Sequence, residues 1–272
     1  MLCAKKQDLQ LWVVKWHSMN LQKVLSKHID RKVPEIIFLF WVIKLLSTAL
    51  GESVSDYLVH AINPIYAVCI GAVGFGVSID LQLFAKKYTA WIYWLAVVMV
   101  AVFGTIAADV VHIVLGVPYL ISATCFAVGL VIIFVAWYAV EKDLSIHSIN
   151  TPRRELFYWA TVIATFALGT ATGDMTAITF NLGYLASGIL FTVLFIAPLV
   201  GHRLFKLNEI FTFWFAYIMT RPFGASFADW TGRAPNMGGI GIGTGKVSLI
   251  LFALIIILVG YLTISKKDIK TR

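Results

Sequence analysis

The chain has 272 residues, of which 60% are hydrophobic and only 13% are charged, and its formal net charge is +8. Its mean hydropathy is +0.85. This composition excludes a water-soluble globular protein and predicts an all-α, polytopic membrane protein. The basic excess requires no nucleic acid, because basic loops and tails are attracted to anionic membrane lipids.

Residues 1–33 form a basic segment before the first long apolar run. Leu11, Trp12, Val13, Val14 and Trp16 stand among its lysines, which suits an amphipathic helix lying on the inner leaflet. A flexible tail that only orients the first spanning helix fits the same residues. We expect no cleavable signal peptide, because the first long apolar run begins after residue 33 and belongs to a repeat.

Eight apolar stretches follow in the chain. Each approaches or exceeds the roughly 20 residues that a spanning helix needs. We predict transmembrane helices at 36–58, 61–84, 92–114, 117–140, 157–179, 183–201, 210–229 and 247–264.

One sequence motif occurs four times, in the first, third, fifth and seventh of these stretches. An aromatic residue precedes a Trp, a Gly follows the Trp by ten residues, and an Asp follows it by fifteen: Trp41, Gly51 and Asp56; Trp94, Gly104 and Asp109; Trp159, Gly169 and Asp174; Trp214, Gly224 and Asp229. Such periodicity predicts internal repeats. We expect four two-helix repeats at 34–87, 88–152, 153–206 and 207–265, and then a basic tail at 266–272.

The distribution of Lys and Arg predicts the orientation. Eighteen of the 22 lie before the first helix, after the last, or in the loops before the third, fifth and seventh helices. Positive charge marks the cytoplasmic side, so both termini are expected there. Every repeat then begins on the same side, which predicts parallel repeats about an axis along the membrane normal. A pseudo-fourfold ring and a pair of four-helix halves both satisfy this rule.

Three segments carry a resemblance to a known family: LSTALGESVSDYL at 46–58, NTPRRELFYWATVIATFALGTATGD at 150–174 and TRPFGASFADWTGRAPNMGGIGIG at 220–243. They resemble a bacterial family of membrane-anchored proteins built from four copies of a repeat of unknown function. The resemblance covers nearly all of residues 33–265 and implies an integral inner-membrane protein. It brings no established substrate or reaction, so no site residue is carried over from it.

Each repeated Gly is followed four residues later by another small residue: Ser55, Ala108, Gly173 and Ala228. Small residues at this spacing let membrane helices approach closely, so the odd-numbered helices are expected to make the inner contacts. The carboxyls of Asp56, Asp109, Asp174 and Asp229 come next and are our first candidate binding groups. The alternative is that each Asp caps a neighbouring helix end and recurs only because the unit was duplicated.

Further polar residues break the symmetry of the repeats. Lys44, Thr48, Glu52 and Asp56 follow one another at four-residue steps on the first helix, while Arg221 and Pro222 lie in the seventh. Thr105 and Thr170 take the place of Glu52 in the second and third repeats. Ionisable groups inside a membrane cost about 2.5 to 3.5 kcal/mol each and usually face a partner or a water-filled cavity.

These charges predict binding of a small cation or a proton. The two positive charges are Lys44 and Arg221, and the five carboxyls are those of Glu52 and the four repeated Asp. Together they have a formal charge of −3 if all are ionised. The alternative is a set of buried ion pairs that only fix helix packing, for example Lys44 with Glu52 or Arg221 with Asp229.

Other motifs are weaker. His60 and His112 follow their Asp by four and three residues, which would suit a transition metal, but the third and fourth repeats lack an equivalent. The segment from Gly238 to Lys246 fails the phosphate-loop pattern, because Ile240 replaces the first Gly and Val247 replaces the final Ser or Thr. We interpret it as an outer loop with Arg233 and Lys246 as its cations.

We therefore expect a small cation transporter or permease, with a proton as a candidate coupling ion and with membrane lipids as its surroundings. No cofactor and no enzymatic activity are predicted, because hydrolase and metalloprotease motifs are absent from the sequence. The alternative from another class is a non-transporting scaffold or sensor with structural ion pairs. A membrane-embedded lipid enzyme that uses two Asp as acid and base is a third hypothesis.

Overall fold

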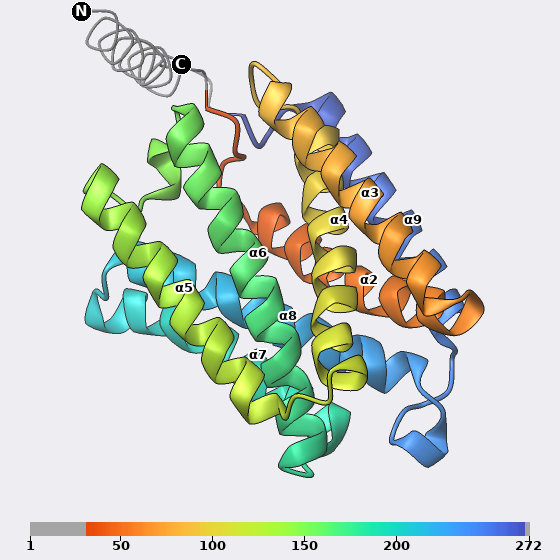
Figure 1. The fold of residues 1–272 in the computed structure, drawn as a ribbon. Helices are drawn as coiled ribbons and strands as arrows, with labels where there is room; N and C mark the ends of the chain where they lie inside the picture. The colour runs from red at the N-terminus through yellow and green to blue at the C-terminus, as the bar shows by residue number, and fades with distance from the viewer. Residues whose placement is uncertain (1–30, 270–272) are drawn as a thin grey trace, which may run out of the picture.

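The computed structural model describes residues 31–269 as a bundle of long helices (Figure 1). The helices are α2 (Phe38–Ala61), α3 (Pro64–Phe84), α4 (Ala90–Asp109), α5 (Tyr119–Glu141), α6 (Pro152–Asp174), α7 (Gly183–Phe205), α8 (Glu209–Gly232) and α9 (Thr244–Ser265). The predicted all-α class is confirmed, and each predicted helix corresponds to an observed one. The amphipathic helix considered within residues 1–33 and the end of the tail lie almost wholly outside the described residues.

Seven of these helices are long and apolar enough to cross a membrane, and α8 is the exception. Helix α8 contains buried polar residues that include Thr220, Arg221 and Asp229. It packs against α2, α6, α7 and α9. A helix surrounded by other helices does not need an apolar surface of its own, so its polar composition is compatible with an interior position.

The first helices of the repeats form the inner layer. In the most apolar 18-residue stretch of each helix, 56% of the residues are buried for α2, α4 and α6. The share is only 22 to 33% for α3, α5, α7 and α9. Each inner helix packs on the next: α2 on α4, α4 on α6, α6 on α8, and α8 back on α2. The inner helices therefore form a closed ring, which decides between the two arrangements that the sequence left open.

The repeated glycines lie at the contacts of this ring. A Cβ added to Gly51 would overlap Ala101, one on Gly104 would lie 3.1 Å from Phe166, one on Gly169 would lie 2.5 Å from Arg221, and one on Gly224 would overlap Thr48. In each case the neighbouring residue stands three positions before the Gly of the next repeat. The expected role of the repeated glycines in close helix contact is confirmed.

The second helices form an outer layer with the same rotation. Helix α3 packs mainly on α4, α5 on α6, α7 on α8, and α9 on α2. Each repeat is thus tied to the next one, and the last is tied to the first. The backbone N–H of Glu35 also donates to the carbonyl of Asp268 at 2.9 Å, so the two ends of the described chain meet.

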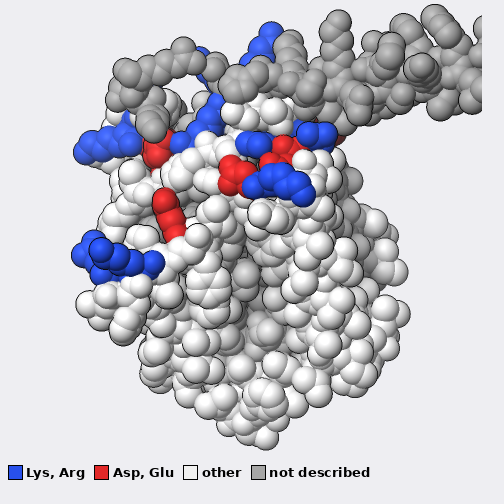
Figure 2. All heavy atoms as spheres, turned by 90° about the vertical axis from the view of Figure 1, so that its left-hand side faces the viewer, with Lys and Arg blue, Asp and Glu red and all other residues white. Residues whose placement is uncertain are grey.

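We call the end of the bundle where α2 begins and α9 ends the basic end. Figure 2 shows Lys, Arg, Asp and Glu side chains gathered towards this end on the visible face, above a broad uncharged surface. At this end the Lys32 side chain is 4% exposed and its ammonium donates to Glu155 at 2.7 Å, while Gln82 donates to the same carboxyl at 3.1 Å. The opposite end carries the repeated Asp, and we call it the Asp end.

The Asp end has irregular helical turns. Helices α4 and α6 end at Asp109 and Asp174, and the chain continues in π-helical turns, Val110–Val114 and Met175–Thr179. Such turns are rare and occur often at functional sites. After α8 the loop folds back on its own helix, since the N–H groups of Ile240 and Ile242 donate to carbonyls of Trp230 and Thr231.

The glycine contacts lead to a stability prediction. Gly224→Ala should destabilise the bundle by about 1 to 3 kcal/mol, because its methyl group would overlap Thr48 and the backbone of Ala49. Unfolding in mixed SDS micelles, followed by tryptophan fluorescence, measures this. Gly129→Ala on α5 is the matched control, since its Cβ would meet nothing within 4 Å. Equal stability of the two variants would contradict the close-contact role.

Candidate functional site

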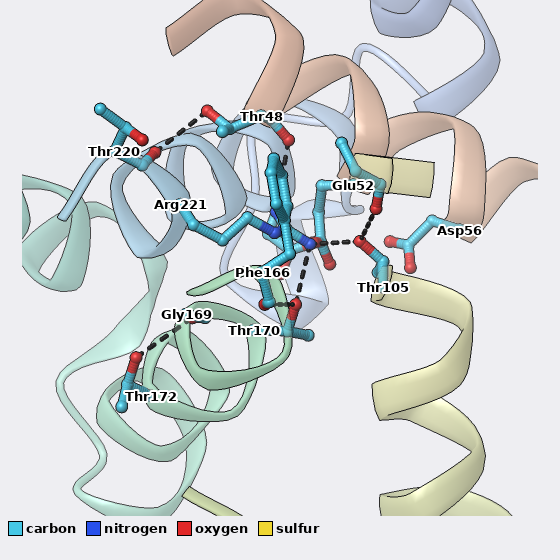
Figure 3. A network of polar contacts seen from close by, with 12 residues as sticks. Thr48, Glu52, Asp56, Thr105, Phe166, Gly169, Thr170, Thr172, Thr220 and Arg221 are labelled. Atoms are coloured by element: carbon cyan, nitrogen blue, oxygen red, sulfur yellow. Dashed lines mark hydrogen bonds and ion pairs between the residues drawn. The ribbon is translucent and has the colours of Figure 1, made fainter. Parts of the chain in front are cut away.

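The centre of the ring is occupied by the side chain of Arg221. Its Nη2 donates to Glu52 Oε2 at 2.6 Å and to Thr170 Oγ1 at 2.9 Å, and it also donates to Thr105 Oγ1. Nη1 donates to the carbonyl of Thr48 at 3.3 Å. These partners come from α2, α4 and α6, so one guanidinium joins all four inner helices (Figure 3).

The repeat places the partners of Arg221 at equivalent positions on three inner helices. Glu52, Thr105 and Thr170 each follow their motif Trp by eleven residues, and Arg221 lies one turn before the equivalent position on α8. Arg221 is 1% exposed and Glu52 is 2% exposed. A buried pair of this kind depends on its additional hydrogen bonds to offset the loss of hydration. The two threonines and the Thr48 carbonyl supply them.

The two example pairings of the sequence analysis are wrong. Arg221 pairs with Glu52 and not with Asp229, because the α2 and α8 backbones lie in direct contact at Gly224. Lys44 does not pair with Glu52, which lies two turns further along the same helix. The partners cross between helices instead.

Lys44 lies in an aromatic cage towards the basic end from Arg221. Its Nζ lies 3.9 Å from the ring centroid of Tyr217 and 4.4 Å from that of Phe166. The residue is 1% exposed, and its ammonium has no hydrogen-bond partner among the described residues. Cation–π contacts with desolvated rings stabilise a charge by about 2 kcal/mol each. They supply no hydrogen-bond acceptor.

A second ion-pair group lies at the Asp end. Arg233 Nε donates to Asp229 Oδ1 at 2.8 Å, and its Nη2 lies 3.2 Å from Asp56 Oδ2. One carboxylate oxygen each of Glu52, Asp56 and Asp229 lie within 4.8 Å of one another. We call Glu52, Asp56, Asp229 and Arg233 the carboxylate cluster. Two repeated Asp, from the first and last repeats, are therefore brought together.

The importance of Arg233 was missed by the sequence analysis, which assigned it to an outer loop. Its signal was its position four residues after Asp229, one helical turn on. Burial opposes the charged form of its guanidinium, but the carboxylates of Asp229 and Asp56 outweigh burial and raise the pKa of Arg233. Arg233 is thus a fixed positive charge between two of the candidate carboxylates.

Asp109 and Asp174 take the equivalent positions on α4 and α6. Asp174 is 7% exposed, and Asp109 is half-buried. Neither makes a side-chain hydrogen bond or ion pair with any residue that the structure describes. Both lie within electrostatic range of Glu52 and Asp56. With Lys44, Arg221 and Arg233 charged against five carboxylates, the interior has a formal charge of −2.

The histidines do not join this group. His60 Nδ1 contacts the carbonyl of Asp56 at 2.6 Å, and His112 lies beside the Val117 carbonyl and the Ser122 hydroxyl at 3.3 Å. The potential ligand set found among the described residues contains only carboxylates. The arrangement therefore offers no support for transition-metal binding through His60 and His112, and favours a cation with a preference for oxygen.

Comparison with known proteins gives one family match, to the Repeat of Unknown Function (DUF347), at residues 92–143, 157–207 and 212–268. The chain belongs to this repeat family. Residues 34–87 are not matched by the family model, although α2 and α3 complete the ring formed by the three matched units. No curated protein and no solved structure gave a match.

Proposed function

We propose that the protein is a small cation permease of the bacterial inner membrane, with its basic end and both termini in the cytoplasm. Seven apolar spanning-length helices and the charges gathered at one end support this placement. The proposal includes no enzymatic step and no cofactor. Its surroundings are membrane lipids, and its cargo is a small inorganic cation.

The single observation that carries the proposal is the convergence of Glu52, Asp56 and Asp229 beside a fixed guanidinium. Three carboxylate oxygens within 4.8 Å of one another repel unless a cation or protons neutralise them. Arg233 supplies one positive charge to this cluster, and Arg221 supplies another through Glu52. A free cation could replace the Arg233 guanidinium between Asp56 and Asp229.

Successive cation sites continue from the carboxylate cluster into the bundle. Arg221 lies among a carboxylate and two threonine hydroxyls, and Lys44 lies among aromatic rings. Each of these positions along the bundle thus has groups that stabilise a positive charge. At each one the positive charge is that of a side chain, Arg221 or Lys44. In this arrangement Arg221 and Lys44 act as internal counter-charges that block free passage, and their movement would open the path.

A scaffold with structural ion pairs is the alternative function. The hydrogen bonds of the Arg221 Nη atoms favour it, since such a network holds four helices in place. The two functions differ in what they require of Asp109 and Asp174. A scaffold gains nothing from these unpaired carboxyls, whereas a permease uses their charge to attract its cargo.

The double variant Asp109→Asn, Asp174→Asn tests this difference. We expect cation uptake by proteoliposomes under an imposed gradient to fall by about 10-fold or more, since 1.4 kcal/mol of lost attraction corresponds to a factor of ten. Unfolding should stay close to wild type, because no ion pair is broken. Na⁺, K⁺, Mg²⁺ and Mn²⁺ are the probes.

Asp80→Asn on the exposed face of α3 is the matched control and should leave uptake unchanged. The permease proposal fails if wild-type protein moves none of these cations under any gradient. It also fails if the double variant transports as well as wild type. A scaffold predicts no uptake in either protein.

A further inference from the structure

A group of buried tyrosine hydroxyls lies between Lys44 and the basic end. Tyr93 on α4, Tyr158 on α6 and Tyr217 on α8 are each at most 1% exposed. The hydroxyl oxygens of Tyr93 and Tyr158 are 2.5 Å apart. The Tyr217 hydroxyl faces both within electrostatic range, but makes no regular hydrogen bond with the described residues. We call these three residues the tyrosine group.

The repeat positions these hydroxyls. Tyr93 and Tyr158 are the aromatic residues directly before the motif Trp on neighbouring inner helices. Tyr217 follows its Trp by three residues, which is the position that Lys44 takes on α2. Because α2 and α8 pack side by side, this equivalence brings Lys44 against the Tyr217 ring. The tyrosine group and Lys44 thus occupy adjacent levels of one ring.

Lys44 lies between the tyrosine group and the carboxylates along α2. On α2, Lys44, Thr48, Glu52 and Asp56 follow at four-residue steps and are all buried. From the other inner helices, Lys44 is faced by Phe166 of α6 and by Tyr217 and Arg221 of α8. The two rings offset part of the hydration that the buried ammonium loses, but they offer it no hydrogen-bond acceptor. The Tyr217 hydroxyl, which also lacks a hydrogen-bond partner among the described residues, belongs to one of the two rings that contact the ammonium.

The tyrosine group reaches the basic end through Tyr88 and Asp268. The ring of Tyr88 meets that of Tyr93 edge-on, with centroids 5.8 Å apart. The Tyr88 hydroxyl donates to Asp268 Oδ2 at 2.5 Å. Asp268 is 2% exposed and lies beyond the last helix. Burial raises the pKa of the Asp268 carboxyl, against the opposing effect of the hydrogen bond from Tyr88. This carboxyl can therefore hold or release a proton closer to neutral pH.

We propose that Lys44 and the tyrosine group form a proton path between the carboxylate cluster and Asp268 at the basic end. A hydroxyl accepts a proton on a lone pair while it releases its own, so no tyrosinate forms and no electron is transferred. Lys44 gives one ammonium proton to Tyr217 and becomes an amine, and a proton from the carboxylate cluster restores it. Rotation of the four-carbon Lys44 chain and of the hydroxyls bridges the steps. The inference rests on the proposed function only in taking the carboxylate cluster as the entry to the bundle, and it does not require that cation uptake is coupled to the proton.

Tyr158→Phe tests the path, because it removes the central hydroxyl and keeps the ring. Purified protein is reconstituted in liposomes that contain a pH-sensitive dye, and proton flux is measured after a pH step. We expect the flux to fall by about 10-fold or more, within the range for losing a proton-transfer group. Cation uptake driven by membrane potential should stay within about twofold of wild type, because it needs no proton.

Tyr138→Phe on the lipid-facing side of α5 is the matched control, since Tyr138 is 56% exposed. Tyr93→Phe and Lys44→Met interrupt the path at other points and should reproduce the loss, which guards against a folding defect in one variant. Wild-type proton flux in all three variants overturns the path, and so does a wild-type protein that conducts no protons. Absence of cation uptake with intact, tyrosine-dependent proton flux would reject the permease proposal and keep the path.

Discussion

Arg221→Met is expected to destabilise the protein by about 3 to 5 kcal/mol, the cost of breaking a buried ion pair by removing one partner. Glu52, which is 2% exposed, would be left without its counter-charge, and Thr105 and Thr170 would lose their shared donor. Since the guanidinium joins all four inner helices, the loss affects the whole ring. Unfolding in mixed SDS micelles with tryptophan fluorescence measures the effect.

A second substitution tests the cause of this effect. Glu52→Leu combined with Arg221→Met should recover most of the lost stability, because buried pairs are often replaced by apolar side chains at little cost. Arg203→Met at the exposed end of α7 is the matched control for loss of an arginine. If Arg221→Met unfolded like this control, the Arg221 network would have no structural role, and the scaffold alternative would lose its support.

Arg233→Gln is expected to strengthen cation binding about 10- to 100-fold, which corresponds to about 1.4 to 2.8 kcal/mol. The variant removes the fixed cation between Asp56 and Asp229, so their carboxylates become available to a free ion. Isothermal titration with Na⁺, K⁺, Mg²⁺ and Mn²⁺ measures the affinity. Without added cation the variant should be less stable than wild type, and saturating cation should restore it.

Two controls sharpen this result. Arg233→Lys keeps the charge and should bind cations no more tightly than wild type. Lys246→Gln removes an exposed cation in the first turn of α9, and should leave the affinity unchanged. An unchanged affinity in Arg233→Gln would contradict the role of Asp56 and Asp229 as a cation site occupied by the protein itself.

Much of this architecture could be predicted from the sequence. The eight apolar stretches predicted the helices, because span length and hydropathy are properties of a local segment. The repeated Gly predicted the inner helices, because close approach in a membrane requires small residues. The polar stripe from Lys44 to Asp56 was predicted, since the four-residue step places these residues on one helix face, and the structure buries all of them.

The partners within the site could not be predicted in this way. Glu52 and Arg221 are 169 residues apart, and Tyr93 and Tyr158 are 65 residues apart. The order of the helices around the ring decides whether such residues meet, and several orders satisfy the same periodicity. Arg233 was assigned to a loop because nothing local indicates that α8 places it beside Asp56 of α2.

The sequence alone therefore determined the membrane class, the helices, the repeat and the depth of each charge along its helix, since these depend on composition and local spacing. Only the tertiary structure decided that the repeats close into a ring and that Lys44 lies among aromatic rings. It also decided the ion pairs, in which Arg221 binds Glu52 and Arg233 binds Asp56 and Asp229. The physical reason is that a buried charge is stabilised by whatever packing brings within a few ångströms. Packing is a property of the whole bundle.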